Sequence, residues 1–134
     1  KAALRTFQNF GQSLGASLVN VLTLIDGLIV IGGGLSGAWD LFSDHMFKEI
    51  NGSYSDTAGK QHSRLSFEVF NLEDPLTFET FAEGNPGTIQ VPASDISRVY
   101  DAMPRTGIGI SSLGVSRATT IGAYSFAINK LNKQ

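Results

Sequence analysis

The chain has 134 residues, of which 10 are basic, 12 are acidic and none is cysteine, so its formal net charge is −2. This length suits one domain. Charged residues make up 16% of the chain, against roughly 25% in a typical soluble domain, which suggests that another surface covers part of it. The lack of cysteine excludes disulfides and thiolate metal sites.

Charge and hydropathy argue against two classes of partner. Ten Lys and Arg spread over the whole chain do not form the basic face that nucleic acid requires, so we expect no nucleic-acid partner. The longest purely apolar run, Leu28 to Ile31, is far shorter than the ~20 residues of a membrane span. We expect no membrane partner and a cytoplasmic location. Because the sequence begins at Lys1 without methionine, we also expect residues 1–134 to be a single lobe of a larger protein.

The first predicted element is a long amphipathic helix over residues 3 to 25, where apolar residues recur every three or four positions. Gly11 and Gly15 lie four positions apart on one stripe of this helix. Each glycine costs up to about 1 kcal/mol relative to alanine in a helix interior. The stripe therefore suggests that another backbone or a ligand lies close to it.

The next element is a strand over residues 28 to 31, whose unbroken apolar run predicts the centre of a parallel sheet, buried on both faces. Gly32, Gly33 and Gly34 end this strand, and Ser36 is placed to cap the helix that follows. The predicted fold class is therefore α/β, with a central parallel strand, a glycine-rich loop and a helix in direct succession.

The middle of the chain is predicted to contain short elements. Residues 51–63 are polar and predict an exposed loop, and residues 64 to 72 alternate as a half-buried strand does. Asp74 and Pro75 begin a short helix over residues 75 to 83, which Gly84 ends. Residues 85–105 predict a β excursion with two short strands. Prolines in this segment limit how far the two strands can pair.

A final helix is predicted from Ser116 to Leu131.

The polar side chains outside the glycine-rich loop do not form a recognisable catalytic pattern. Asp40 and Asp44 are expected on a solvated helix face, with Asp44 paired to Lys48, rather than as catalytic acids. His45 is expected at the edge of the core and His62 in solvent. No spacing among the histidines and acids predicts a metal site.

The glycine-rich loop is the strongest candidate for a binding site. Without Cβ atoms, the backbone N–H groups of Gly32, Gly33 and Gly34 can approach a ligand, and the N-terminus of the following helix attracts anions. A nucleotide is the natural ligand, although a tight turn explains the same glycines equally well. Gly32, Gly34 and Gly37 also match the G-x-G-x-x-G pattern of dinucleotide-binding domains. That pattern requires an acid about 20 residues later, at the end of the next strand. This position lies near Asp56, in the polar loop instead of a strand.

Four segments carry a resemblance to a known family: Phe10-Gly11-x-x-Leu14-Gly15-x-x-Leu18-x-Asn20, Ile29 to Ser36, Thr106 to Ala118, and Gly122-Ala123-Tyr124-x-x-Ala127. Together they resemble the C-terminal half of a glucokinase-like sugar kinase of the repressor/open-reading-frame/kinase (ROK) family. The resemblance implies the C-terminal lobe of an actin-like ATPase, with a ribonuclease-H-like fold. It also implies that an adenine nucleotide, ATP with Mg²⁺ in the full-length parent, faces five residues: Gly32, Gly33, Gly34, Leu35 and Ser36.

The resemblance also implies what lies outside this chain. The family's Asp-x-Gly-Gly-Thr phosphate loop, Asn-Asp base segment, Glu-x-Gly-His sugar motif and cysteine-rich zinc motif do not occur in the sequence. We therefore assign no catalytic residue and no metal ligand here. We expect the nucleotide-binding part of an ATP-dependent hexose kinase, with the hexose substrate and the N-terminal lobe belonging to the parent, and we expect a homo-oligomer.

Two other functions stay open. The chain could be the sugar-sensing domain of a ROK-type transcriptional repressor, whose DNA-binding helices would lie upstream. Less well supported is a dinucleotide-binding domain, which would bind a nicotinamide cofactor in place of ATP.

Overall fold

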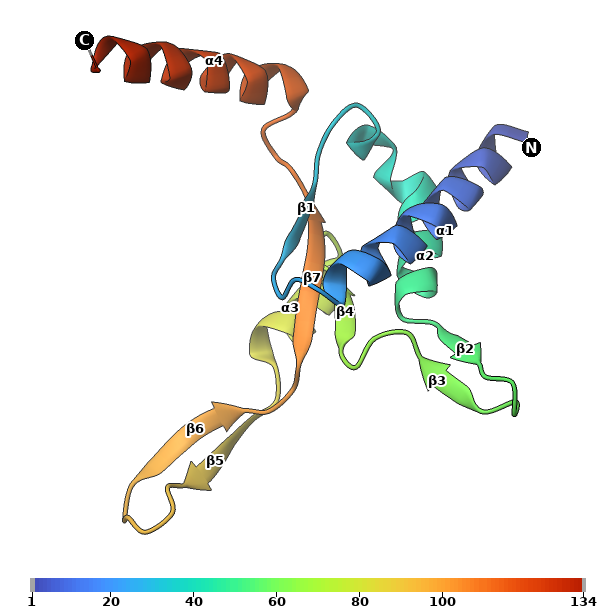
Figure 1. Cartoon of the computed structure of the whole chain (residues 1–134), viewed down its shortest axis with the longest axis vertical. Helices are drawn as coiled ribbons and strands as arrows, with labels where there is room; N and C mark the ends of the chain where they lie inside the picture. The colour runs from blue at the N-terminus through green and yellow to red at the C-terminus, as the bar shows by residue number, and fades with distance from the viewer. Residues whose placement is uncertain (1, 134) are drawn as a thin grey trace.

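A three-stranded parallel sheet organises the computed structural model, which describes residues 2 to 133 (Figure 1). Its strands lie in the order β1 (Ile29–Ile31), β7 (Arg105–Ile110) and β4 (Glu68–Asn71). The helices are α1 (Ala2–Leu22), α2 (Trp39–Ile50), α3 (Pro75–Glu83) and α4 (Val115–Leu131). The protein is therefore an α/β protein with a parallel sheet, as the sequence predicts.

The central strand is β7, and the prediction that residues 28 to 31 form the centre is wrong. Among the described residues β1 pairs with β7 alone, and Val30 is 68% exposed. β7 is buried from Thr106 to Gly109, yet two of these four residues are glycine. A Cβ atom on Gly107 would lie 2.5 Å from Leu72 Cδ2, so the glycine makes room for the Leu72 side chain. Hydropathy therefore understates how deeply β7 is buried.

Helices cover both faces of the sheet. Val69 and Phe70 are consecutive residues of β4, so their side chains point to opposite faces. Val69 joins the buried cluster that includes Phe42 and Met46 of α2. The Phe70 ring lies 5.8 Å from the Phe81 ring of α3. α2 thus packs on one face and α3 on the other.

α1 packs closely along α2 through its two buried glycines. A Cβ atom on Gly15 would lie 2.7 Å from the Met46 carbonyl oxygen, and one on Gly11 would overlap the Phe42 carbonyl oxygen. The predicted close approach is confirmed, and its partner is the backbone of α2. The helix ends at Leu22, three residues before the predicted position.

Two antiparallel hairpins extend from this core (Figure 1). The first joins β2 (Ser53–Ser55) to β3 (Gln61–Ser63) inside the segment predicted as a loop. That segment is exposed but not irregular, because Asp56 closes the turn by accepting N–H groups from Ala58 and Lys60. The second joins β5 (Pro86–Gln90) to β6 (Ser97–Asp101), within the predicted excursion at 85–105.

α3 begins and ends as the sequence predicts. The Asp74 carboxylate caps its N-terminus by accepting N–H groups from Leu76 and Thr77, both at 2.9 Å. Gly84 follows the helix with a φ of 64°. The strand predicted at 64 to 72 is shorter, from Glu68 to Asn71. Its outer edge is occupied by the Asn51 amide, which exchanges hydrogen bonds with the Val69 backbone at 2.8 and 3.0 Å.

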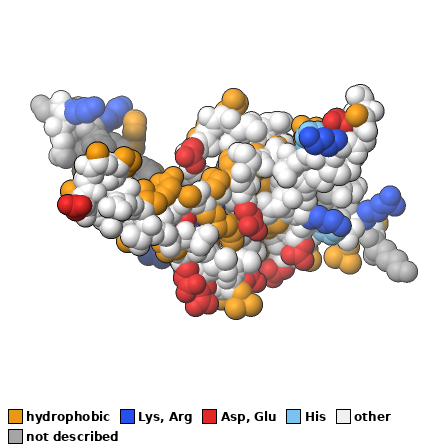
Figure 2. All heavy atoms as spheres, turned by 90° about the horizontal axis from the view of Figure 1, so that it is seen from below, with side chains coloured by type: hydrophobic (Ala, Val, Ile, Leu, Met, Phe, Trp, Pro, Cys, Tyr) orange, Lys and Arg blue, Asp and Glu red, His pale blue; other side chains and the backbone are white. Residues whose placement is uncertain are grey.

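α4 leaves the sheet after β7, and all of its residues are exposed (Figure 1). Large apolar side chains on it, such as Tyr124 at 69% and Leu131 at 71%, are open to solvent. Figure 2 shows further hydrophobic side chains across the middle of one face, with Lys and Arg toward its two ends. No helix of the described residues has the length and hydropathy needed to span a membrane.

Candidate nucleotide-binding site

The glycine-rich loop lies at the carboxyl end of β1. β1 and β7 are parallel, so this loop and the loop after Ile110 project from the same edge of the sheet (Figure 1). Ser111 N–H donates to the Ile31 carbonyl at 2.8 Å and joins the two loops at their base. In open α/β sheets, ligands bind beyond the carboxyl ends of the strands. The predicted site residues are thus placed where such a fold binds ligands.

Residues 33 to 36 form a tight turn. Gly33 has a φ of +101°, a conformation that residues with a side chain rarely adopt. Its carbonyl accepts two bonds from Ser36, from N–H at 3.2 Å and from Oγ at 2.7 Å. The prediction that Ser36 caps the next helix is wrong, because its hydroxyl closes this turn. A 3-10 turn, Ser36–Ala38, then separates the loop from α2, which begins at Trp39.

The loop presents unused donors to solvent. Within the described chain, the N–H groups of Gly33, Gly34 and Leu35 donate to no other atom. Cβ atoms on Gly33 or Gly34 would meet nothing within 4 Å, whereas one on Gly32 would lie 3.6 Å from Ser111 Cβ. Free backbone N–H groups without side-chain obstruction suit the oxygens of a phosphate or a ribose.

An acidic cleft of about 320 Å³ lies between the start of α2 and the start of α3. Its carboxylates belong to Asp40, Asp44, Glu73 and Asp74. Two of them already accept backbone N–H groups: Asp74 caps α3, and Glu73 Oε1 accepts from Ile110 N–H at 2.8 Å. The expected Asp44–Lys48 ion pair does not form within residues 2 to 133.

The described residues contain no group of three or more His, Asp or Glu side chains that could hold a metal ion. Mg²⁺ that accompanies ATP is commonly held by the nucleotide phosphates and one or two carboxylates. Among residues 2 to 133, no cluster of three or more such side chains is therefore available to bind Mg²⁺ without the oxygens of a nucleotide.

The two histidines lie in different parts of the chain. His45 is half-buried beside Gly11, at the edge of the core as expected. His62 is not free in solvent. Its Nε2 lies 2.9 Å from Asp56 Oδ2, and its ring stacks on Tyr54 at 5.5 Å. The hydrogen bond with His62 is the main reason why the pKa of Asp56 lies below its usual value of 3.8.

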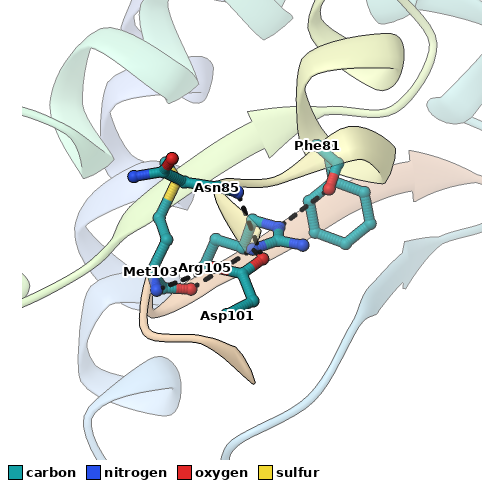
Figure 3. Close-up of polar contacts among 5 residues, drawn as sticks. All are labelled: Phe81, Asn85, Asp101, Met103 and Arg105. Atoms are coloured by element: carbon teal, nitrogen blue, oxygen red, sulfur yellow. Dashed lines mark hydrogen bonds and ion pairs between the residues drawn. The ribbon is translucent and has the colours of Figure 1, made fainter. Parts of the chain in front are cut away.

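Sequence reasoning missed a polar cluster where the β5–β6 hairpin joins the core (Figure 3). Arg105 donates from Nε to the Phe81 carbonyl at 2.8 Å and from Nη1 to Asp101 Oδ2 at 2.5 Å. Asp101 also accepts the N–H groups of Met103 and Asn85, at 2.9 and 3.3 Å. The hydrogen bond from Met103 N–H is the largest cause of the lowered pKa of Asp101, and the hydrogen bond from Arg105 is the second. The four-residue spacing of Asp101 and Arg105 was the available signal.

Comparisons with known proteins show a similarity to a glucokinase. No family model and no curated protein matches the chain. Among solved structures, the chain is similar to a glucokinase from Parabacteroides distasonis, with a TM-score of 0.78 and 38% identity over 96% of this chain. The chain spans about a third of that protein's length, 34%. The similarity is consistent with a glucokinase fragment and supports a sugar-kinase-related domain.

Proposed function

We propose that this chain is the adenine-nucleotide-binding portion of an ATP-dependent hexose kinase of the glucokinase-like type. The proposal includes membership of the ROK family and a ribonuclease-H-like lobe formed by residues 1–134. The observation that carries it is the exposed glycine turn, whose free N–H groups lie at the carboxyl end of β1. The similarity to a glucokinase supports the same function.

In this proposal the backbone of Gly32, Gly33 and Gly34 binds the nucleotide, with N–H groups donating to phosphate or ribose oxygens. The Leu35 side chain, which is 53% exposed, offers apolar surface to the base. Ser36 keeps the turn in shape through its bonds to Gly33. ATP would supply the transferred phosphoryl group, and the acceptor hexose and the base that receives its proton would belong to the parent.

The strand order bears on the dinucleotide-binding alternative. In that fold the first two strands of the βαβ unit lie side by side. Here β1 and the next strand of the sheet, β4, lie on opposite sides of β7. Asp56, near the position of the required acid, is instead engaged in its own hairpin turn and with His62. These observations favour ATP over a nicotinamide cofactor. The repressor alternative would share this nucleotide-side fold, and the sequence upstream of the chain distinguishes it from a kinase.

The test uses Gly34→Val in the full-length parent. Gly34 has an ordinary φ and open space around its Cβ position, so valine should leave the fold intact but obstruct a ligand. Gly33→Val is less informative because a φ of +101° would strain any side chain. We expect at least about tenfold weaker ATP binding by calorimetry for Gly34→Val, since one blocked approach costs the phosphate several hydrogen bonds.

The matched control is Gly27→Val, outside the turn, where a Cβ atom also meets nothing within 4 Å. It should bind ATP as the unmodified protein does. Equal ATP affinity for Gly34→Val and the unmodified protein, or tighter binding of NAD than of ATP, would contradict the proposal.

A further inference from the structure

Glu73 provides the end of the central strand with a hydrogen-bond acceptor that the backbone does not supply. The ladder between β4 and β7 closes with Asn71 opposite Ile108, and Leu72 N–H then donates to the Ile108 carbonyl at 2.9 Å. The chain next turns toward the Asp74 cap of α3. Ile110 N–H would therefore have no backbone acceptor on this side, and Glu73 Oε1 accepts it at 2.8 Å. The carboxylate extends the sheet by one hydrogen bond.

The end of β7 is also what holds the glycine turn. Ile110 lies opposite Ile31, and Ser111 N–H donates to the Ile31 carbonyl at 2.8 Å, directly before Gly32. Beyond this point Gly33 and Gly34 have no neighbour within 4 Å of their Cβ positions. The remaining bonds, from Ser36 to the Gly33 carbonyl and from Ala38 N–H to the Leu35 carbonyl at 3.0 Å, lie within residues 33 to 38 and do not reach the sheet. The position of the turn relative to the sheet therefore depends on the Ile110–Ser111 backbone.

Gly109 makes room for this contact. A Cβ atom at Gly109 would lie 3.0 Å from Glu73 Oε1, closer than nearly all such contacts in proteins. Glu73 also forms no ion pair with a Lys or Arg of residues 2 to 133. The Glu73 carboxylate thus interacts specifically with the Ile110 N–H group. Gly109 lies where a larger side chain would displace this carboxylate.

We infer that Glu73 is a positioning residue for the nucleotide-binding turn: its carboxylate fixes the end of β7 and, through Ser111 and Ile31, the orientation of residues 32 to 35. The effect on nucleotide binding rests on the proposed function, whereas the effect on the turn does not. Glu73 itself need not touch the nucleotide.

Amide hydrogen exchange of the 134-residue chain tests the effect on the turn without ligand. In Glu73→Ala we expect the amides of Ile110, Ser111 and Gly32 to Gly34 to exchange about tenfold faster, the size expected for one lost charge-assisted hydrogen bond. Glu73→Gln keeps a side-chain acceptor and should restore slow exchange. Gly109→Ala, which displaces the carboxylate, should reproduce the effect of Glu73→Ala, and the double variant should add little to either.

The matched control is Glu79→Ala, which removes an exposed acid on α3 that makes no hydrogen bond or ion pair within residues 2 to 133. It should leave exchange in the turn unchanged. Unchanged exchange of the turn amides in Glu73→Ala would overturn the inference. Equal acceleration of the Met46 amide in the core would also overturn it, because the residue would then stabilise the whole fold rather than position the turn.

Nucleotide affinity of the full-length parent separates this inference from the proposed function. We expect ATP to bind about five- to tenfold more weakly to Glu73→Ala and Gly109→Ala, and normally to Glu73→Gln. If the unmodified protein binds no ATP but the turn amides respond to Glu73→Ala, the proposed function fails and the positioning role stands. If the unmodified protein binds ATP and Glu73→Ala binds it equally well, the positioning role for the nucleotide is overturned.

Discussion

Gly11 and Gly15 illustrate what single residues do in this molecule. Each weakens α1 as an isolated helix by up to about 1 kcal/mol. Each also lets the α2 backbone approach, since the Phe42 and Met46 carbonyl oxygens occupy the space of a side chain. The contact buries Val19 and Leu22 of α1 against the same cluster as Phe42 and Met46. Helix propensity is thus given up for close packing.

We therefore predict that Gly15→Leu lowers the free energy of unfolding by roughly 1 to 3 kcal/mol, because overpacking forces the two helices apart. Denaturant unfolding measures the change. Gln12→Leu, on the exposed side of α1, is the matched control and should change stability by less than about 0.5 kcal/mol. An increase in stability for Gly15→Leu would mean that α1 and α2 are not in contact in solution.

Asp56 gives a prediction about pH. Its pKa in the folded protein lies below its usual value of 3.8, chiefly because of the hydrogen bond with His62. A carboxyl group with a lowered folded-state pKa stabilises the fold above the unfolded value, and this contribution is lost as the pH falls through the folded value. The β2–β3 hairpin should therefore become less stable as the pH falls below 3.8.

Amide chemical shifts of residues 53 to 63, recorded between pH 7 and pH 2, test this expectation. Asp56→Ala, which removes the acceptor of the Ala58 and Lys60 N–H groups, should show the disordered hairpin shifts already at neutral pH. Asp95→Ala, at the tip of the other hairpin, serves as the control and should titrate as the unmodified protein does. The same acid transition in Asp56→Ala and in the unmodified protein would contradict the assignment to Asp56.

At the scale of elements, the sequence predicts those whose signals are local. Asp74, Pro75 and Gly84 define α3 within eleven residues, and the two short strands predicted in the 85–105 excursion correspond to β5 and β6. β7 was not predicted as the centre because its burial depends on Leu72 packing against Gly107, a contact that no local pattern encodes. The β2–β3 hairpin was missed since Asp56 closes its turn through backbone bonds, which hydropathy does not reflect.

The β5–β6 hairpin is attached to the core by Arg105. The Arg105 guanidinium donates hydrogen bonds to the Phe81 carbonyl and to the Asp101 carboxylate, and it lies 5.6 Å from the Phe81 ring centre. Lysine keeps the charge but loses the planar fork that makes these contacts together. We predict that Arg105→Lys destabilises the base of the hairpin by about 1 to 2 kcal/mol.

Amide exchange in β5 and β6 measures this effect, which should be largest near Asp101 and absent from α1 and α2. Arg98→Lys, on β6 but without an ion pair among the described residues, is the matched control and should exchange as the unmodified protein does. Equal exchange in the two variants would show that Arg105 does not anchor the hairpin.

At the scale of the whole molecule, the candidate site is only partly predictable. Residues 32 to 36 are adjacent in sequence, so a local pattern is enough to propose them as a site. Glu73 and Ile110 lie 37 positions apart, and their contact depends on how β4 and β7 pair. The acidic cleft likewise combines α2 with the start of α3. Long-range pairing, rather than residue type, decides these parts of the site.

The exposed surface of α4 leads to the last prediction. Ile121, Tyr124, Ile128 and Leu131 follow one another at helical spacing and are 48 to 71% exposed. Exposed apolar stripes of this kind commonly mark an interface. We therefore predict that the 134-residue chain self-associates at micromolar concentration through α4. We also predict that it neither phosphorylates hexose nor hydrolyses ATP, because the proposed function places the catalytic base and the sugar site in the parent.

Sedimentation and a coupled kinase assay test the two halves of this prediction. Replacing Tyr124 and Ile128 together by lysine should shift the chain toward the monomer, because charge repulsion and the lost apolar area both oppose association. Thr119→Lys adds charge on the opposite side of the same helix and should leave the association unchanged. A monomeric unmodified chain would refute the role of α4. Hexose-dependent ADP release by this chain alone would show that residues 1–134 contain catalytic groups after all, and the acids of the α2–α3 cleft would then be the first to mutate.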